Sequence, residues 1–454
     1  MGNHETPDQP LPNGPNLGAK ALGVFGKLQM HGQDVGMSWT RLAQDSPAGT
    51  DTLVLVDTPD PAFWSAGAEI IVAPTGFEPM EREKMTIASV SGNTVTLTES
   101  LMYDHLGSEY SLQDGSVSWN ISAEVGLLTR NVKIIGQDYA EMPDEEFGAR
   151  VLVSKFTQEG TEYRGYAKIA NVEFVRAGQE GWTDAFDPRY ALAFVNHEAS
   201  EDNSAANKES YVKKCGFNYN YNAAIGLFGT DNVLVEDNVV YRTMEYGIRD
   251  EGIGNRFIHN LVVLTKFVGI HKDQRQNFFK HGCYQFKESL DPEFRDNAAA
   301  GCESAGFAGT GHICSSTKRW SGNVMHTCQD GIFTNTYNPP VEVREDKGCV
   351  AFRGFFVYKA YDYAHYLLTH DTVEMEDNLY VDNGVGINPF LIRPRPTTKV
   401  TFNIHLNPKQ ENPVLPCKTI FYKTSKIVEG TRGPFYTTGR FSFLAADTLT
   451  KSDS

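Results

Sequence analysis

The chain has 454 residues, of which 40% are hydrophobic, and its formal net charge is -16 at pH 7. This acidic balance argues against a general affinity for nucleic acid or for an anionic membrane surface. The chain has no apolar run of the roughly 18 residues that a membrane-spanning helix needs, so we predict no membrane insertion of this segment.

The first 120 residues read as short strands joined by tight turns. The segments TDTLVLVDTPD (50–60), AEIIVAPTG (68–76) and EKMTIASVSGNTVTLTESL (83–101) place β-branched runs between turn residues, and SGNT within the last is typical of a hairpin. We therefore predict a small antiparallel β module at residues 31–120. It follows a first region, residues 1–30, in which GAKALGVFGKLQMHG reads as strands with glycine corners.

From about residue 121 onward, a short phrase recurs along the chain. VLVEDNVVY is echoed by NRFIHNLVVL, with an asparagine at the same place in each phrase. Longer gaps in the series contain polar inserts, such as ESLDPEFRDN, that read as loops. The recurring position is occupied in turn by Cys215, Asn238, Asn260, Asn297, Asn323, the region of Phe355, and Asn378.

This recurrence predicts an all-β fold, a right-handed parallel β-helix over residues 121–454. A period of about 20 to 50 residues indicates a solenoid, and β-branched runs broken by Asn, Gly and Asp are typical of strand–turn–strand rungs. A turn asparagine can adopt the left-handed conformation and bond to the next rung. We expect Asn238 and Asn260 to be neighbours in adjacent rungs, about 5 Å apart.

Seven cysteines lie between residues 215 and 417, and none form a CxxC pair, so the sequence predicts no zinc site and no cofactor. An odd number leaves at least one thiol without an internal partner. Cys215 and Cys328 lie inside strand phrases, and we expect them to be buried free thiols. The NIS triplet predicts a glycosylation site at Asn120 and hints at a secretory route.

Several phrases carry a family resemblance. GAKALGVFGKLQMHG, SWTRL, YDHLG, AEVGLLTRNVKIIG and EFGARVLVS occur in order, followed by EGWTDAFDPRYALAFVN and AIGLFGTDNVLVEDNVVY. This set resembles the fibrocystin-L-like family (fibrocystin and fibrocystin-L) over residues 3 to about 420. The matching region runs from the end of a G-eight domain, to which residues 1–30 would belong, through parallel β-helix repeats.

The resemblance implies a segment of a very large receptor-like protein with one C-terminal membrane anchor. We expect this chain to be a fragment that lies at the extracellular face of the plasma membrane or is secreted. The family also carries cysteines at the positions of Cys314 and Cys349, which implies a disulfide between them in an oxidising compartment. Cys283 and Cys302 are a further candidate pair.

Proteins that share this module include hyaluronan-degrading enzymes, so an enzymatic function has to be considered. In those relatives an Arg-Tyr pair precedes two histidines. Here Arg189 and Tyr190 are retained, but ALAFVN stands where the histidines belong, and His197 falls in a polar loop. Imidazoles are the natural acid–base or metal groups near neutral pH, and an Ala-Phe-Val run cannot replace them. We therefore expect Arg189 to form a structural pair with Asp184 or Asp187.

Other side chains are candidates for contact with a sugar. Acids in the turns of nearby rungs could form the carboxylate pair of a glycosidase, although turn acids more often cap backbone groups. Aromatic residues in FNYNYN (217–222) and FFVYKAYDYAHY (355–366) could stack on sugar rings. Two basic spots, Lys318 with Arg319 and Arg393 with Arg395, could contact a polyanion, although a solvated face is the simpler interpretation. The candidate glycan-binding residues are Arg189, Tyr190, Asp184, Asp187, Trp182, Glu245 and Asp250, and Glu251 is a further turn acid.

The sequence thus favours an extracellular β-helical binding or structural module without catalysis. Its ligand would be an extracellular glycan or protein. The alternative is a glycan-active enzyme of the hyaluronidase-related kind, which binds or degrades hyaluronan. The missing histidine pair is the feature that separates the two hypotheses.

Overall fold

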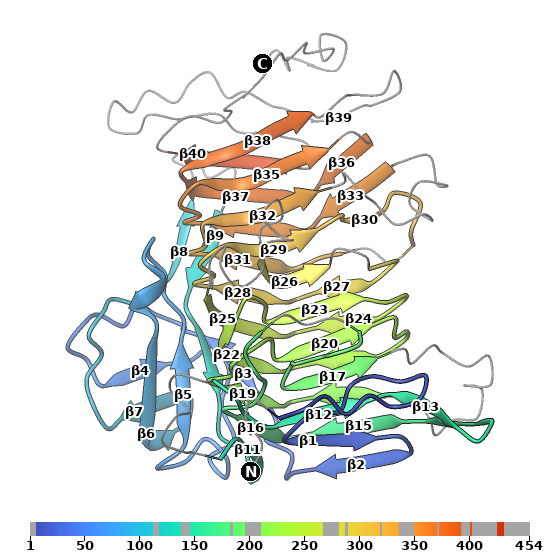
Figure 1. Ribbon diagram of the computed structural model, residues 1–454. Helices are drawn as coiled ribbons and strands as arrows, with labels where there is room; N and C mark the ends of the chain where they lie inside the picture. The colour runs from blue at the N-terminus through green and yellow to red at the C-terminus, as the bar shows by residue number, and fades with distance from the viewer. Residues whose placement is uncertain are drawn as a thin grey trace.

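The computed structural model is a stack of strands with an antiparallel module against its side (Figure 1). The structure describes residues 6–111, 118–137, 146–181, 185–195, 210–266, 281–286, 289–317, 320–335, 349–369, 372–391, 400–401 and 425–430. Within these ranges the helical element is a single 3-10 turn, η1 (Pro79–Glu81). The all-β prediction is confirmed.

The coil has three faces, and the strands of each face pair mainly in parallel. The first face contains β1 (Ala21–Val24), β12 (Arg150–Val153), β17 (Leu192–Val195), β20 (Ile225–Phe228), β23 (Ile248–Glu251), β26 (Gly282–Phe286), β29 (Ala305–Gly309), β32 (Asp330–Asn335), β35 (Tyr363–Thr369) and β38 (Val385–Leu391). The second face contains β11 (Val132–Ile135), β16 (Val172–Val175), β19 (Gly216–Asn218), β22 (Val239–Met244), β25 (Leu261–Lys266), β28 (Ala298–Ala300), β31 (Asn323–His326), β34 (Phe355–Tyr358), β37 (Asn378–Asn383) and β40 (Ser425–Gly430).

The third face is made of two sheets. The first is parallel and contains β2 (Lys27–His31), β15 (Tyr166–Ala170), β18 (Tyr211–Lys213), β21 (Leu234–Glu236), β24 (Arg256–Ile258) and β27 (Glu293–Arg295). The second contains β30 (His312–Ile313), β33 (Cys349–Arg353), β36 (Thr372–Glu376) and β39 (Val400–Thr401), and its β30–β33 pair is antiparallel.

One coil takes a strand from each face in turn, and like positions stack on the next coil. β20, β21 and β22 pair in parallel with β23, β24 and β25, which puts Val239 opposite Leu261. Parallel strands buried on the inner face read as near-continuous apolar runs, which explains the Val-, Ile- and Phe-rich phrases of the repeat.

The recurring asparagines form a hydrogen-bonded ladder at the corner between the third and second faces. Asn238 Nδ2 donates to Asn260 Oδ1 at 2.9 Å, and Asn260 Nδ2 donates to Asn297 Oδ1 at 2.9 Å. Asn297 Nδ2 continues the series to Asn323 Oδ1 at 3.1 Å, and the backbone N–H of Cys215 donates to Asn238 Oδ1. The prediction that Asn238 and Asn260 lie in adjacent rungs is confirmed.

The left-handed residue at this corner is not the asparagine that was expected. It is the residue just before each ladder position, for example Asp237 (φ +53°), His259 (φ +51°) and Asp296 (φ +57°). That residue turns the chain, so the following asparagine can point inward and use its amide to hold the neighbouring rungs. The ladder asparagines themselves are fully buried.

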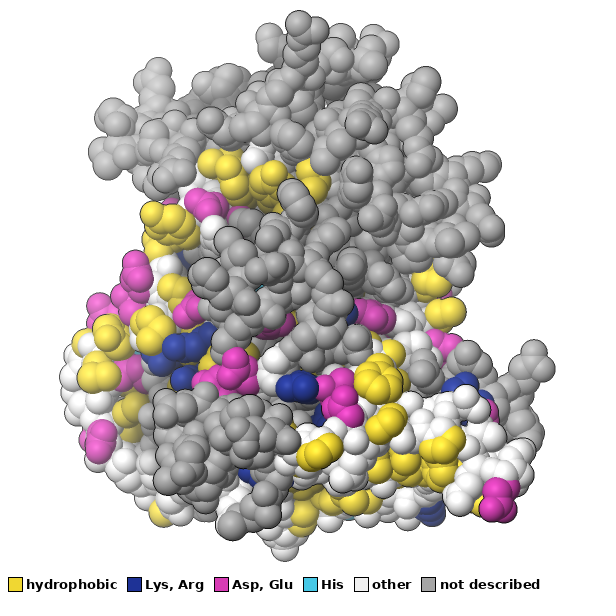
Figure 2. Space-filling view, viewed as in Figure 1, with side chains coloured by type: hydrophobic (Ala, Val, Ile, Leu, Met, Phe, Trp, Pro, Cys, Tyr) yellow, Lys and Arg dark blue, Asp and Glu magenta, His cyan; other side chains and the backbone are white. Residues whose placement is uncertain are grey.

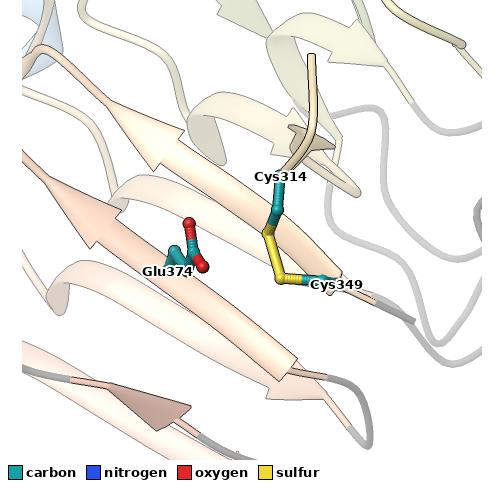
Figure 3. Close-up of side chains that lie close together, drawn as sticks. All are labelled: Cys314, Cys349 and Glu374. Carbon is teal, nitrogen blue, oxygen red and sulfur yellow. A yellow bond between two sulfur atoms is a disulfide. The ribbon is translucent and has the colours of Figure 1, made fainter. Parts of the chain in front are cut away.

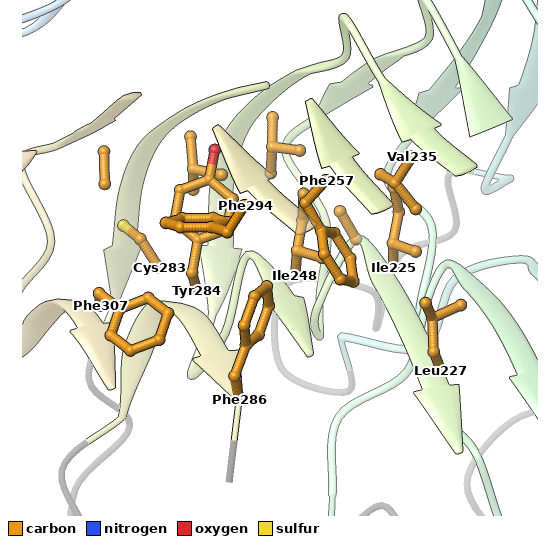
Figure 4. Close-up of a cluster of buried hydrophobic side chains, with 14 of the residues drawn as sticks. Ile225, Leu227, Val235, Ile248, Phe257, Cys283, Tyr284, Phe286, Phe294 and Phe307 are labelled. Carbon is orange, nitrogen blue, oxygen red and sulfur yellow. The ribbon is translucent and has the colours of Figure 1, made fainter. Parts of the chain in front are cut away.

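The interior of the coil is packed with stacked apolar side chains. Phe257, Phe286, Phe294 and Phe307 form an aromatic group with ring centroids 4.6 to 5.4 Å apart, beside Tyr284 (Figure 4). These rings are fully buried or nearly so. Edge-to-face aromatic pairs of this kind add about 0.5–1.5 kcal/mol each beyond their buried area.

The antiparallel module is a six-stranded sheet. It contains β3 (Trp39–Arg41), β10 (Glu124–Leu127), β5 (Glu69–Val72), β6 (Glu83–Ser91), β7 (Thr94–Leu97) and β4 (Thr52–Val54), and a bridge between Leu42 and Leu55 joins its two edges. Two ribbons complete the described strands: β8 (Gly107–Ser111) with β9 (Ser118–Ser122), and β13 (Lys155–Gln158) with β14 (Thr161–Arg164).

The division of the chain at residues 30 and 120 stays a prediction, but the pairing of strands crosses both positions. β1 and β2, from the first region, pair with β12 and β15 of the coil. β10 lies beyond residue 120 and pairs with β3 and β5 of the module. β10 joins the module because its residues, EVGL, are all buried and extend the apolar face of the antiparallel sheet.

Candidate functional site

The Arg189 side chain is held by its own neighbours in the segment that enters β17. Arg189 Nε donates to Asp187 Oδ2 at 2.6 Å, and its Nη1 donates to the carbonyl oxygen of Glu180 at 2.8 Å. The other carboxylate oxygen of Asp187 accepts from Arg150 Nη1 at 2.9 Å. The predicted structural pair is confirmed with Asp187 as the partner.

Arg150 makes this cluster a packed one rather than a surface pair. Its side chain is 2% exposed, and it also donates to the carbonyl oxygens of Pro188 and Leu17. Burial lowers the pKa of Arg150, while the hydrogen bond that it donates to Asp187 acts in the opposite direction. Asp187 therefore accepts from one buried and one partly exposed guanidinium, which commits both of its oxygens to protein contacts.

Tyr190 is fully buried and faces Arg249 on the first face. Its hydroxyl accepts from Arg249 Nη1 at 2.9 Å, and its ring stacks on Phe228 with centroids 5.4 Å apart. A Cβ at Gly226 would lie 1.9 Å from the Tyr190 ring, so the ring occupies the space that a side chain would need there. Burial raises the pKa of Tyr190 well above its usual value, although Arg249 opposes this.

Arg249 in turn pairs with Glu251, its neighbour on β23, through Nε at 2.7 Å. Its guanidinium also lies over the rings of Phe228 and Tyr246, 5.2 and 5.3 Å from their centroids. Glu251 is thus a structural partner of an arginine. Of the predicted glycan contacts, Tyr190 is part of this packed cluster and offers no exposed ring.

Asp250 points into the coil and holds the turn after β23. It accepts from the backbone N–H of Gly252 at 3.1 Å and from Asn255 Nδ2 at 2.7 Å, and Ser289 Oγ donates to its second oxygen. Burial raises the pKa of Asp250 to about 7, although these hydrogen bonds oppose the shift. The structural role expected for this acid agrees with these contacts.

Glu245 is a further candidate acid that the structure describes. Glu245 lies at the corner between β22 and β23 with φ +61°, and its backbone N–H donates to Lys266. Trp182, Asp184, His197, Lys318, Arg319, Arg393 and Arg395 lie outside the described residues. Among the aromatic candidates, Phe217 and Tyr358 are buried, and Tyr219 lies under Arg242.

The two predicted disulfides are present. Cys314 and Cys349 are bonded with Cα atoms 5.6 Å apart, and Cys283 and Cys302 are bonded at 6.0 Å. Cys215 and Cys328 are buried free thiols, as expected, and burial raises the pKa of each, to about 11 for Cys215 and about 12 for Cys328. These thiols therefore stay protonated near neutral pH.

Glu374 lies beside the Cys314–Cys349 disulfide, and the three side chains are close enough to suggest a metal site (Figure 3). The two sulfur atoms are bonded to each other, so neither is a thiolate that could bind a metal. Glu374 also pairs with Arg353, whose Nη2 lies 3.1 Å from the carboxylate. The group therefore offers too few free ligands for a metal ion.

A cleft of about 1020 Å³ lies between the module, the β8–β9 ribbon and the second face. No local sequence pattern indicates it, because its walls come from segments more than 200 residues apart. The residues that matter here are Trp39 and Arg41 of β3, Asp57, Glu109, Trp119 and Asn120 of the ribbon, Glu124 of β10, and Phe356, Tyr358 and Leu379 of the second face.

Charged groups at the base of the cleft tie the module to the coil. Glu124 is fully buried, with Arg41 Nε 3.1 Å from one oxygen and His326 Nε2 2.9 Å from the other. Burial alone would raise the pKa of Glu124, but His326 and Arg41 outweigh it and lower the pKa to about 2. His326 also stacks on Tyr358 at 4.4 Å.

Comparison with known protein families matches two domain models to this chain. The G8 domain model matches residues 1–43, and the CEMIP beta-helix model matches residues 146–329. The G8 match is longer than the expected remnant at residues 1–30, and it reaches β3 of the module. Together with the coil, these matches define a protein of the class that carries a G8 domain followed by a parallel β-helix.

The relatives identify the family more closely. The chain is 34% identical to human fibrocystin-L over 401 residues, or 87% of this chain, and 31% identical to dog fibrocystin over 83% of it. The chain belongs to the fibrocystin-L-like family. It spans 9% of the length of human fibrocystin-L and 8% of that of dog fibrocystin.

A solved structure, the tailspike protein gp49 of Pseudomonas phage LKA1, aligns with 84% of this chain and 66% of its own. It shares 12% sequence identity, and its TM-score of 0.19 is too low to support a conclusion about this chain. The described part of the chain contains no helix with the length and apolar character needed to cross a membrane.

Proposed function

We propose that this chain is an extracellular binding or structural module of a large fibrocystin-L-like surface protein and that it does not cleave glycans. The proposal rests on the hydrogen bonds that hold Arg189 and Tyr190 within the protein. Arg189 is held by Asp187 and Glu180, and Tyr190 is buried against Arg249. Neither side chain is free to bind a substrate carboxylate or to transfer a proton.

The strand that follows supports the same proposal. Leu192, Ala193, Phe194 and Val195 of β17 are all fully buried. Where the hyaluronan-degrading relatives carry histidines, this strand has apolar side chains that cannot act as acid, base or metal ligand near neutral pH. Asp250 is enclosed in the coil, where a glycosidic bond cannot reach it.

The surface charge is also consistent with a module that does not bind a polyanion along its length. Acidic and basic side chains are interspersed on the described part of the face shown in Figure 2. The formal net charge of -16 adds a general repulsion toward hyaluronan, which is itself anionic.

The test pairs a depolymerisation assay with a melting experiment. Purified wild-type protein and Arg189→Ala are incubated with labelled hyaluronan, with and without calcium, and both are melted. We expect no shortening by either protein and a loss of about 1–3 kcal/mol in the variant, because Asp187 loses one of its two cations.

Arg164→Ala is the matched control, since Arg164 pairs with Glu162 on the exposed β13–β14 hairpin. Its cost should stay below about 1 kcal/mol. Depolymerisation by wild type that disappears in Arg189→Ala at unchanged melting temperature would establish the alternative, a glycan-active enzyme, in place of this proposal.

A further inference from the structure

The cleft between the module and the second face contains a predicted glycosylation site in its own wall. Asn120 is exposed on β9, and the triplet Asn120-Ile121-Ser122 meets the requirement for an N-linked glycan. Asn120 lines the cleft together with its strand neighbour Trp119. An oligosaccharide attached at Asn120 would therefore start inside the cleft.

The charge of the cleft favours a neutral saccharide. Asp57, Glu109 and Glu124 contribute carboxylates to the lining, and Arg41 is its cation. Nε of Arg41 is already paired with Glu124, so the lining carries a net negative charge at neutral pH. Like charges repel, so a uronic acid or a sulfated sugar fits this lining less well than an uncharged N-acetylhexosamine.

The cleft also offers aromatic rings beside these charges. Trp119 and Phe356 are only partly buried, so a ligand in the cleft can reach them. Trp39, Trp119, Phe356 and Leu379 supply the apolar surface on which sugar rings pack.

We propose that an N-linked oligosaccharide on Asn120 seats its first N-acetylglucosamine residues in this cleft, where they bridge the β8–β9 ribbon and the second face. The cleft volume of about 1020 Å³ is at the upper end of the roughly 300–1,000 Å³ of ligand pockets. Attachment to the wall makes binding intramolecular, so weak contacts are enough to keep the sugars in place.

The modification is a group transfer from a lipid-linked diphosphate oligosaccharide. A bond forms between Asn120 Nδ2 and the anomeric carbon of the first sugar. The bond from that carbon to the diphosphate breaks, the lipid diphosphate leaves, and the amide nitrogen loses one proton. The inference rests on the extracellular part of the proposed function, because this donor acts only on chains that enter the secretory pathway.

The experiment uses the whole chain secreted from a eukaryotic host, with Asn120→Gln as the unmodified reference. The mass of the peptide that contains Asn120 reports occupancy. Peptide N-glycosidase is then applied to folded and to unfolded protein, and we expect release from the folded protein to be at least about tenfold slower. An unmodified Asn120, or equal release rates in both states, would overturn the proposal.

Phe356→Ala tests the binding of the sugar in the cleft, because it removes a partly buried ring from the lining. It should speed release from the folded protein several-fold and leave occupancy unchanged. Tyr361→Ala is the matched control, since Tyr361 is 59% exposed and does not line the cleft, and it should change nothing. Equal release rates in wild type and in a folded Phe356→Ala protein would overturn the proposal that the sugar occupies this cleft.

A free neutral saccharide could bind in the cleft through the same contacts as the covalently attached glycan. Bacterially produced protein, which lacks the modification, is titrated with chitobiose while tryptophan fluorescence is followed. Binding by this protein together with an unmodified Asn120 in the secreted protein would assign the cleft to a separate saccharide and refute the covalent source. Hyaluronan cleavage would refute the proposed function and leave the glycan result intact, so the two failures are distinguishable.

Discussion

Asp187 shows how a residue pair that looks functional in sequence can be structural in the fold. It lies between Arg150 and Arg189 and accepts a hydrogen bond from each guanidinium. Two fixed cations around one carboxylate satisfy both of its oxygens. The Arg-Tyr pair therefore anchors the entry to β17 through contacts within the protein.

Asp250 gives a prediction at the same scale, because its pKa is raised to about 7 in the folded chain. The ordinary pKa of an aspartate is 3.8, so between about pH 4 and pH 7 the folded state holds a proton that the unfolded state has lost. Stability from this group is full below about pH 4 and falls as the pH rises to about 7. Asp250→Asn keeps the size and planar shape of the side chain and removes the charge of the ionised carboxylate.

We expect Asp250→Asn to be more stable than wild type by roughly 1–3 kcal/mol at pH 8 and nearly equal to it at pH 4. Urea unfolding at both values measures the difference. Asp231→Asn is the control, since Asp231 accepts from Ile253 at an exposed position on a neighbouring rung, and its effect should not change with pH. A less stable Asp250→Asn at pH 8 would show that the turn needs the ionised carboxylate.

At the scale of the element, the Asn ladder is the structure that keeps successive coils in register. Asn260 accepts from the backbone N–H and the side chain of Asn238, and it donates to the carbonyl oxygen of Val235 and to Asn297. One side chain thus satisfies two backbone groups of the preceding coil and also bonds to the ladder asparagine of the following coil. Since all of them are buried, water cannot replace the amide.

Asn260→Ala should therefore destabilise the chain by about 2–4 kcal/mol, because it leaves more than one buried polar group unsatisfied. The midpoint of urea unfolding measures the loss. Asn131→Ala is the control: Asn131 accepts from the backbone N–H of Gln33 at an exposed site, where water can take its place. A loss below about 1 kcal/mol for Asn260→Ala, equal to that of the control, would contradict the role given to the ladder.

At the scale of the whole molecule, the module is packed onto the second face of the coil rather than joined to it by a flexible linker. Trp39, Ile71 and Leu128 pack against Val239 and Leu261 in one buried cluster. A Cβ at Gly126 would lie 2.8 Å from Val239, so the approach of β10 depends on the missing side chain. The buried Arg41–Glu124–His326 group lies beside this contact.

His326→Ala tests this docking, since it leaves Glu124 buried with Arg41 as its partner. We expect a loss of about 3–5 kcal/mol, seen as a lower melting temperature and faster proteolysis of the module. In the wild type, the lowered pKa of Glu124 means that this stabilisation is present above about pH 4.5 and is lost as the pH falls toward about 2.

His31→Ala is the control for this change. His31 is an exposed histidine that stacks on Tyr211, and its removal should cost well under 1 kcal/mol. If His326→Ala melts like His31→Ala and its module resists proteolysis, the charged group does not hold the two parts together.

The sequence by itself determined the features that depend on local spacing. The recurrence through Asn238 and Asn260 was enough to predict a parallel coil, because stacking places residues one turn apart next to each other. The family resemblance supplied the Cys314–Cys349 disulfide. Proximity in the sequence also narrowed the partner of Arg189 to Asp184 or Asp187, and the structure shows the pair with Asp187, two positions away.

Only the tertiary structure decided which distant residues meet and which side chains are buried. Glu124 and His326 are 202 residues apart, and no local pattern indicates that they meet. The burial of Tyr190 and Asp250 depends on neighbours in other coils, since one strand pattern suits an exposed or an enclosed acid equally well. The cleft beside Asn120 exists because the module docks on the second face, and that contact is set by packing between segments with no shared sequence signal.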